Sequence, residues 1–133
     1  MTHDRTYPDV PGGPHLRTIA MPRDANPTGA IFGGWTLSQM DLAGASCAAQ
    51  RVHERVATIG IDAMEFRAPI EVGDEVSVFA WLHEVGRTSI KVRLEAWTRP
   101  RVGEGEAELV TEGVFTYVAL DERGKPTRIE AEE

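Results

Sequence analysis

The stretch Asp24-Ala-Asn-Pro-Thr-Gly-Ala-Ile-Phe-Gly-Gly-Trp-Thr-Leu-Ser-Gln-Met-Asp41 passes from an irregular loop into a long helix. Its first half contains proline and glycine, which favour a loop. The glycine pair Gly33-Gly34 then leads into a helix predicted over residues 35–53. The first N–H groups of a helix have no partner within it and carry partial positive charge. Because glycine leaves these groups uncovered, Gly33 and Gly34 form a candidate site for an oxyanion or a polarised carbonyl.

The predicted helix has unusually small side chains, since its middle reads Ala43-Gly-Ala-Ser-Cys-Ala-Ala49. Other parts of the backbone can therefore approach it closely. With about 100° between successive residues, one stripe of the helix holds Leu37, Asp41, Ala45, Ala48 and Val52. Asp41 is the only charged residue on this stripe, which makes it a candidate for chemistry. The alternative is that Asp41 faces water or accepts a local hydrogen bond.

Composition restricts the classes of function. The chain has 133 residues, which suits a single domain, and a formal net charge of −7. This acidic balance argues against general binding of nucleic acid or of an anionic membrane, because both need a basic surface. The first residues lack the apolar core of a signal peptide. A single cysteine excludes an internal disulfide framework, so the sequence predicts a cytoplasmic protein.

The rest of the chain alternates turns and strands. We predict an N-terminal arm without regular structure over residues 1–13, one domain over residues 14–128 and a solvated acidic tail over residues 129–133. Strands are predicted over residues 15–21, 56–67, 74–85, 88–99 and 106–120, the third and fourth forming a hairpin with period-2 alternation. One helix followed by an antiparallel meander indicates an α+β fold, with a five-stranded sheet curled around the helix.

Several motifs together resemble the signature of hotdog-fold acyl-CoA thioesterases of the bacterial YciA type. The resemblance covers residues 17–128, and its most specific part is the combination of Asp-Ala-Asn, Phe-Gly-Gly-Trp and Gln-Met-Asp within residues 24–41. The later matching segments are Met64-Glu-Phe-Arg-Ala-Pro-Ile, Val72-Gly-Asp, Gly86-Arg-Thr-Ser and Val114-Phe-Thr-Tyr-Val. The resemblance implies a hotdog fold and hydrolysis of acyl-CoA thioesters.

The resemblance also implies an assembly and a site. Members of this family form homodimers with one continuous sheet, and these dimers often assemble into hexamers as trimers of dimers. An asparagine at the position of Asn26 and an aspartate at the position of Asp41 are catalytic in relatives, and different subunits contribute them. Without the resemblance, Asn26 would be read as a residue that builds its own loop. No metal or redox cofactor is implied, because coenzyme A enters only as part of the substrate.

An acidic chain that binds coenzyme A must gather local positive charge for its phosphates. Arg67, Arg87, Lys91 and Arg93 lie on or near the ends of predicted strands and are candidates. The segment Gly86-Arg-Thr-Ser adds two hydroxyl groups and a turn backbone to one of these cations, and the resemblance places it in the coenzyme A groove. The predicted coenzyme A contacts are therefore Arg67, Gly86, Arg87, Thr88 and Ser89.

Other chemistries are less well supported. The Gly-x-Ser-x-Gly motif of serine hydrolases is absent, Cys47 lies among alanines, and the four histidines lack metal-ligand spacing. For the predicted hydrolysis, Asp41 could be a general base or a nucleophile. Two alternatives stay open, namely a non-catalytic module that binds or senses acyl-CoA and a hotdog dehydratase. The dehydratase is disfavoured because no histidine lies near the helix start.

Overall fold

The computed structural model describes residues 6–100 and 102–132 of the 133-residue chain. In chain order its elements are β1 (Leu16–Ile19), the 3-10 helix η1 (Pro22–Asp24), α1 (Gly33–Val52), β2 (Arg55–Phe66), β3 (Asp74–Val85), β4 (Ser89–Pro100) and β5 (Glu108–Leu120). The predicted helix and all the predicted strands are present. The helix begins two residues earlier than predicted, so Gly33 and Gly34 are its first residues.

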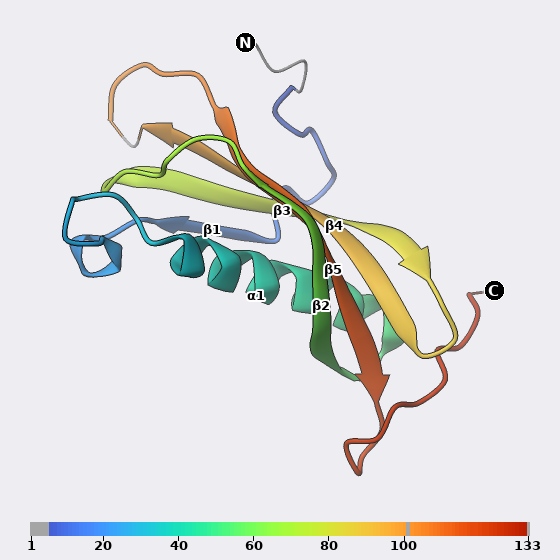
Figure 1. Cartoon of the computed structure of the whole chain (residues 1–133). Coiled ribbons are helices and arrows are strands. Elements are labelled where there is room, and N and C mark those ends of the chain that lie inside the picture. Colours follow the sequence, from blue (N-terminus) through green and yellow to red (C-terminus); the bar gives the residue numbers. More distant parts are fainter. Residues whose placement is uncertain (1–5, 101, 133) are drawn as a thin grey trace.

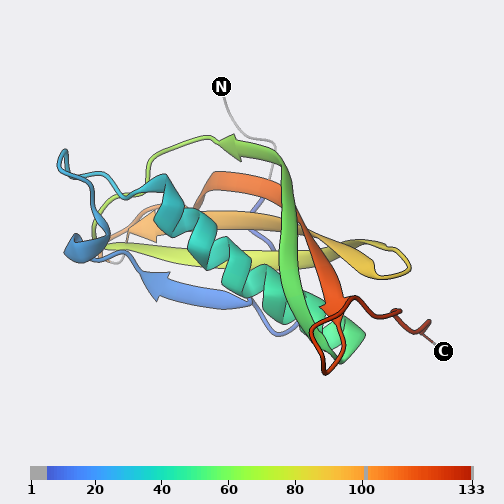
Figure 2. The same ribbon diagram turned by 60° about the horizontal axis from the view of Figure 1, so that its bottom comes forward.

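One antiparallel sheet contains all the strands, in the order β1-β3-β4-β5-β2. β3 and β4 form the predicted hairpin. Figures 1 and 2 show how the sheet curls around α1, which lies across its concave side. The register between β2 and β5 shifts twice, and Ala63, which lies within the second shift, has a positive φ of 52°. β1 and β2 are the two edge strands, so the sheet is not closed.

The core lies between α1 and the concave face of the sheet. Alternate residues of β4 are fully buried there, as the period-2 pattern predicted, namely Ile90, Val92, Leu94 and Ala96. Gly44 marks the close approach of α1 to this face. A Cβ atom at this position would lie 2.2 Å from the hydroxyl oxygen of Tyr117 and 3.0 Å from Cδ1 of Leu94. The small residues of α1 thus bring the helix backbone within hydrogen-bond reach of β5.

The opposite side of α1 is not covered by any of the described elements, as Figure 2 shows. Every fourth residue along this side is exposed, namely Gly34, Ser38, Leu42, Ser46 and Gln50. Leu42 is the only large apolar side chain in this series, and it is 61% exposed. The helix therefore presents a mostly small and polar surface to the surroundings, beside the half-buried Asp41.

A second, smaller apolar cluster lies on the other face of the sheet. Residues 6–13 form no helix or strand, as predicted for the arm. Tyr7 nevertheless packs its ring edge-on against Phe79 and Trp97, with ring centroids 5.2 Å and 5.6 Å apart. Part of the predicted arm thus covers this face, while residues 1–5 lie outside the described residues.

The C-terminal segment differs from the predicted solvated tail at its first residue. The side chain of Ile129 is only 7% exposed, and its N–H donates to the carbonyl oxygen of Arg87 at 2.7 Å. Nη1 of Arg51, in the last turn of α1, donates to the carbonyl oxygen of Glu130 at 3.1 Å, and its Nε lies 3.3 Å from the carboxylate of Glu132. Ile129 therefore belongs to the core, and Glu130 and Glu132 attach the segment after it to α1.

Candidate functional site

Asp41 lies in the third turn of α1, with its side chain half-buried against β2 and β5. Oγ1 of Thr58 donates to Oδ1 of Asp41 at 2.6 Å, and the hydroxyl of Tyr117 donates to the same oxygen at 3.0 Å. Thr58 and Tyr117 are opposite each other in the pairing of β2 with β5. Among the residues that the structure describes, none donates a hydrogen bond to Oδ2. Asp41 is therefore fixed through one oxygen, and the other is left for a ligand.

Tyr117 is a permanent donor in this arrangement. Burial, and then the charge of Asp41 and the hydrogen bond to it, raise the pKa of the Tyr117 phenol far above its ordinary value. The phenol therefore keeps its proton at neutral pH and acts as a hydrogen-bond donor. Its hydroxyl also donates to the backbone carbonyl oxygen of Asp41 at 3.1 Å. Neither Thr58 nor Tyr117 was singled out from the sequence, because their meeting depends on the strand register.

Asn26 organises the loop before α1. Its Oδ1 accepts hydrogen bonds from the N–H of Thr28 at 2.9 Å, from the hydroxyl of Thr28 at 2.7 Å and from the N–H of Ala30 at 3.2 Å. The backbone N–H of Asn26 donates to the carbonyl oxygen of Ala30 at 2.7 Å. Its side-chain amide donates to no group in the described part of the chain. The loop-building interpretation thus accounts for Oδ1, while the amide remains available as a donor.

The glycine pair supplies the first N–H groups of α1. No side chain caps this end, where Phe32 is the N-cap residue. Within residues 6–100 and 102–132, the N–H groups of Gly33 and Gly34 donate to no other group. Nothing would contact a Cβ at Gly34, and one at Gly33 would meet only the ring of Phe66, 3.5 Å away. Two donors at the positive end of the helix are therefore open to a ligand.

The structure does not bring all the predicted catalytic groups together within one chain. Gly33 and Asp41 are eight residues apart on the same helix, which corresponds to about 12 Å along its axis. Asn26 is in the loop at the glycine end. The chain thus carries two half-sites, with Asn26, Gly33 and Gly34 at the start of α1 and Asp41 two turns further on.

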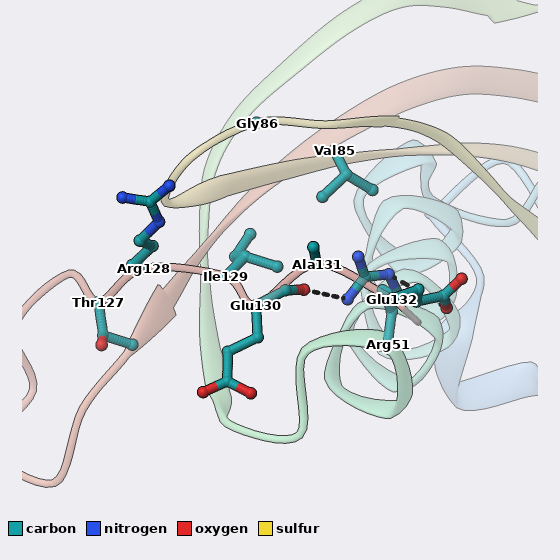
Figure 3. A pocket seen from close by; sticks show the side chains of 9 residues that line it. All are labelled: Arg51, Val85, Gly86, Thr127, Arg128, Ile129, Glu130, Ala131 and Glu132. Atoms are coloured by element: carbon teal, nitrogen blue, oxygen red, sulfur yellow. Dashed lines mark hydrogen bonds and ion pairs between the residues drawn. The ribbon is translucent and has the colours of Figure 1, made fainter.

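The turn at residues 86–89 borders a cleft at the C-terminal end of α1 (Figure 3). The N–H of Gly86 closes this turn by donating to the carbonyl oxygen of Ser89 at 2.7 Å. Arg51 and Arg128 also line the cleft, and neither of them was predicted as a site residue from the sequence. Arg51 points toward the segment at residues 130–132, whereas Arg128 points away from it. Arg51 is ten residues after Asp41, about 15 Å along α1.

Arg67 lies at the other end of the molecule, in a cleft beside Gly33 and Phe66. Its guanidinium binds the carboxylate of Glu112 and lies 3.1 Å from Oε2 of Glu65. Two carboxylates therefore already surround this cation. Within one chain the structure does not bring Arg67 near the turn at residues 86–89, with which it was grouped as a coenzyme A contact.

Cys47 is a free, buried cysteine, and burial raises the pKa of its thiol. It is therefore a core residue and not an activated nucleophile, as the sequence predicted. In the described residues, no group of three or more His, Cys, Asp or Glu side chains could hold a metal ion. The helices in that part of the chain include none that is long and apolar enough to cross a membrane.

Comparisons with known proteins identify the family. The family model described as "Thioesterase superfamily" matches residues 28–104, which is more than half of the chain. An uncharacterized acyl-CoA thioester hydrolase of Haemophilus influenzae is 46% identical over 88% of this chain and 77% of its own length. The acyl-CoA thioester hydrolase YciA of Escherichia coli is 43% identical over 88% of this chain and 90% of its own length.

Solved structures agree with the sequence comparison. HI0827, a hexameric broad specificity acyl-coenzyme A thioesterase, superposes with a TM-score of 0.84 at 44% identity, covering 95% of this chain and 86% of the other. The hexameric thioesterase y2039 of Yersinia pestis gives a TM-score of 0.84 at 42% identity, covering 92% of this chain and 100% of its own. As the sequence resemblance predicted, this chain belongs to the thioesterase superfamily and has the hotdog fold.

Proposed function

We propose that this protein hydrolyses acyl-CoA thioesters to a free acid and coenzyme A. The observation that carries the proposal is the half-buried carboxylate of Asp41, which two hydroxyl donors hold on the central helix of a thioesterase-family chain. The two relatives named as acyl-CoA thioester hydrolases support the substrate class. The chain has one cysteine and so cannot form an internal disulfide, which supports the predicted cytoplasmic location.

In the proposed reaction, the N–H groups of Gly33 and Gly34 stabilise the negative charge that develops on the thioester oxygen. Asp41 either takes a proton from water as the water oxygen attacks the carbonyl carbon, or attacks that carbon itself to form an anhydride that water opens. In both routes the carbon–sulfur bond breaks, and the thiolate of coenzyme A takes up a proton. A carboxylate, N–H donors and water suffice, so we propose that no metal or redox cofactor takes part.

We further propose that two copies of the chain build each site. A nucleophile and the oxyanion donors must lie within about 3 Å of the reacting group, yet Gly33 and Asp41 are separated by about 12 Å on one helix. If the helix α1 of a second chain lay antiparallel to that of the first, the Asn26 and glycine pair of one chain would come close to the Asp41 of the other. The amide of Asn26 would then donate to the thioester oxygen or to the attacking water.

The edge strand β2 is the proposed contact between the two copies. Its apolar side chains Ile59, Ile61 and Phe66 are 61%, 43% and 57% exposed. Leu42 on the uncovered side of α1 adds to this apolar surface. An unpaired edge strand with exposed apolar side chains is normally covered by a partner, and HI0827 and y2039 are both hexameric. We therefore propose a homodimer through β2 and a hexamer as a trimer of dimers.

This assembly gives a prediction in solution. We expect light scattering at micromolar concentration to show at least a dimer for the wild-type protein. Replacing an exposed apolar residue at the edge by a cation, as in Ile59→Lys, should shift the protein to smaller species and lower thioesterase activity. The matched control Val102→Lys changes an exposed residue in the turn after β4 and should leave the molar mass unchanged. A monomeric wild-type protein would contradict the composite site.

The turn at residues 86–89 is the proposed phosphate end of the coenzyme A groove. The extended pantetheine arm of coenzyme A could run along α1 from the thioester at Asp41 to this turn. Arg87 is exposed there, and its backbone is held by the hydrogen bond from Ile129. Its guanidinium is therefore presented on a fixed turn, which suits a phosphate contact. Arg67 would contribute only if another subunit brought it to the groove.

The predicted effect of Arg87→Ala is on binding. A phosphate contact remote from the thioester stabilises the ground state and the transition state equally. Steady-state kinetics should therefore show a raised KM with nearly unchanged kcat. Arg123→Ala, in the exposed turn after β5, is the matched control and should change neither constant. A large fall in kcat at unchanged KM would remove Arg87 from the phosphate end of the groove.

The direct test of the proposed function is release of free thiol from acyl-CoAs of short, medium and long chain. Turnover above the uncatalysed rate with at least one chain length supports the proposal. No turnover with any chain length would contradict it. Tight binding of acyl-CoA without turnover would instead identify a binding module, and hydration of an enoyl-CoA would identify a dehydratase.

A further inference from the structure

We propose that Tyr117 is a positioning residue that fixes the carboxylate of Asp41 through Oδ1 and leaves Oδ2 as its reactive oxygen. This inference rests on the proposed function and adds a residue and an atom to it. The geometry that supports it is the pair of hydrogen bonds from one hydroxyl to Oδ1 and to the backbone carbonyl oxygen of Asp41, at 3.0 Å and 3.1 Å.

The hydroxyl of Tyr117 shares its one proton between Oδ1 and the backbone carbonyl oxygen of Asp41, and so links the carboxylate to the backbone of the same residue. The bond to the carbonyl oxygen fixes the hydroxyl relative to the helix backbone, and the bond to Oδ1 then fixes the side chain relative to the same hydroxyl. Thr58 adds a second donor to Oδ1 at 2.6 Å. With two donors on one oxygen, that oxygen is the weaker base of the two. We therefore expect Oδ2 to be the oxygen that takes the proton from water or that attacks the carbonyl carbon.

Tyr117 is itself held firmly in place. It lies on β5, is 0% exposed and belongs to the core between α1 and the sheet. Its hydroxyl sits in the space that Gly44 leaves open, because a Cβ atom there would lie only 2.2 Å from the hydroxyl oxygen. A rigid donor is needed for a positioning role, since a mobile one would not restrict the carboxylate to one orientation.

The test is Tyr117→Phe, which keeps the ring and removes the hydroxyl. Loss of a hydrogen bond to a charged group should lower kcat by about 10- to 100-fold. KM should stay within about twofold, because no substrate contact changes. Gly44→Ala should give the same signature, because the added methyl group displaces the hydroxyl. The control Val78→Ala removes fully buried volume from β3 and should lower the melting temperature while leaving kcat unchanged.

A double-mutant comparison separates action through Asp41 from action elsewhere. In an Asp41→Ala background the side-chain acceptor is gone, so adding Tyr117→Phe should lower the residual kcat no further. An equal fold loss in both backgrounds would overturn the proposal, as would a kcat of Tyr117→Phe within about twofold of wild type. A loss of kcat in Val78→Ala equal to that in Tyr117→Phe would also overturn it, because the effect would then be one of stability.

A spectroscopic measurement keeps the inference independent of turnover. The carbon-13 resonance of the Asp41 carboxyl group, assigned by its absence in Asp41→Ala, should move in Tyr117→Phe and stay in place in Val78→Ala. An unchanged resonance in Tyr117→Phe would overturn the positioning role even in an active enzyme. A wild-type protein that releases no thiol from any acyl-CoA but shows the resonance shift would instead overturn the proposed function and leave the positioning of Asp41 supported.

Discussion

Asp41→Asn is expected to lower kcat by on the order of 100- to 10,000-fold, which is the usual contribution of a general base. The amide can accept the hydrogen bonds of Thr58 and Tyr117 through its own Oδ1, so the side chain should keep its place. What it loses is the basic or nucleophilic oxygen at the second position. Thiol release measured under saturating acyl-CoA, together with a melting curve, checks both the loss and the survival of the fold.

The matched control for this variant is Glu104→Gln, which makes the same chemical change at an exposed position between β4 and β5. It should retain wild-type kcat. A kcat for Asp41→Asn within tenfold of wild type would exclude Asp41 as the base or nucleophile. A loss of activity together with a collapse of the melting temperature would mean that the carboxylate is needed for folding.

Subunit exchange should restore activity to a mixture of two inactive proteins, Asp41→Asn and Asn26→Ala. In a mixed dimer, one of the two sites regains both wild-type residues while the other loses both. Random pairing makes about half of the dimers mixed, so recovery should approach roughly a quarter of wild-type activity if the sites act independently. Two different affinity tags allow the mixed species to be isolated and assayed alone, where about half of the wild-type activity is expected.

Two controls separate catalysis from loop structure in this experiment. Asn26→Asp keeps an oxygen that can accept the three hydrogen bonds of the loop, but it removes the amide donor. If Asn26 acts as a donor, both Asn26→Asp and Asn26→Ala should be inactive, and both should be complemented by Asp41→Asn. If Asn26 only builds the loop, Asn26→Asp should be active. Isolated mixed dimers without activity would show that Asn26 and Asp41 do not share a site.

The sequence predicted best what depends on local periodicity. The alternation along residues 88–99 correctly predicted which side of β4 faces the core, because that pattern is local to one strand. The glycine pair correctly marked the start of α1. The position of Asp41 on a stripe of small residues indicated a packed environment, and its side chain is indeed half-buried.

What the sequence left unpredicted depends on contacts between distant residues. The two partners of Asp41 come from β2 and β5, 17 and 76 residues away along the chain, and only the strand register brings them together. Arg67 was predicted to contact coenzyme A because the strand register that places it beside Glu112, 45 residues further on, cannot be read from the sequence. Ile129 was assigned to the tail because a single apolar residue among charges has no periodicity to reveal that it is buried.

The contact between Gly44 and Tyr117 has an evolutionary consequence. Position 44 can accept a larger side chain only if the ring or hydroxyl at position 117 is removed or displaced, since both cannot occupy the same space. The two positions should therefore vary together among homologous sequences. A lineage that replaced Gly44 would have to find another donor for the carboxylate at position 41, so this pair of residues would restrict the paths by which the helix can diverge.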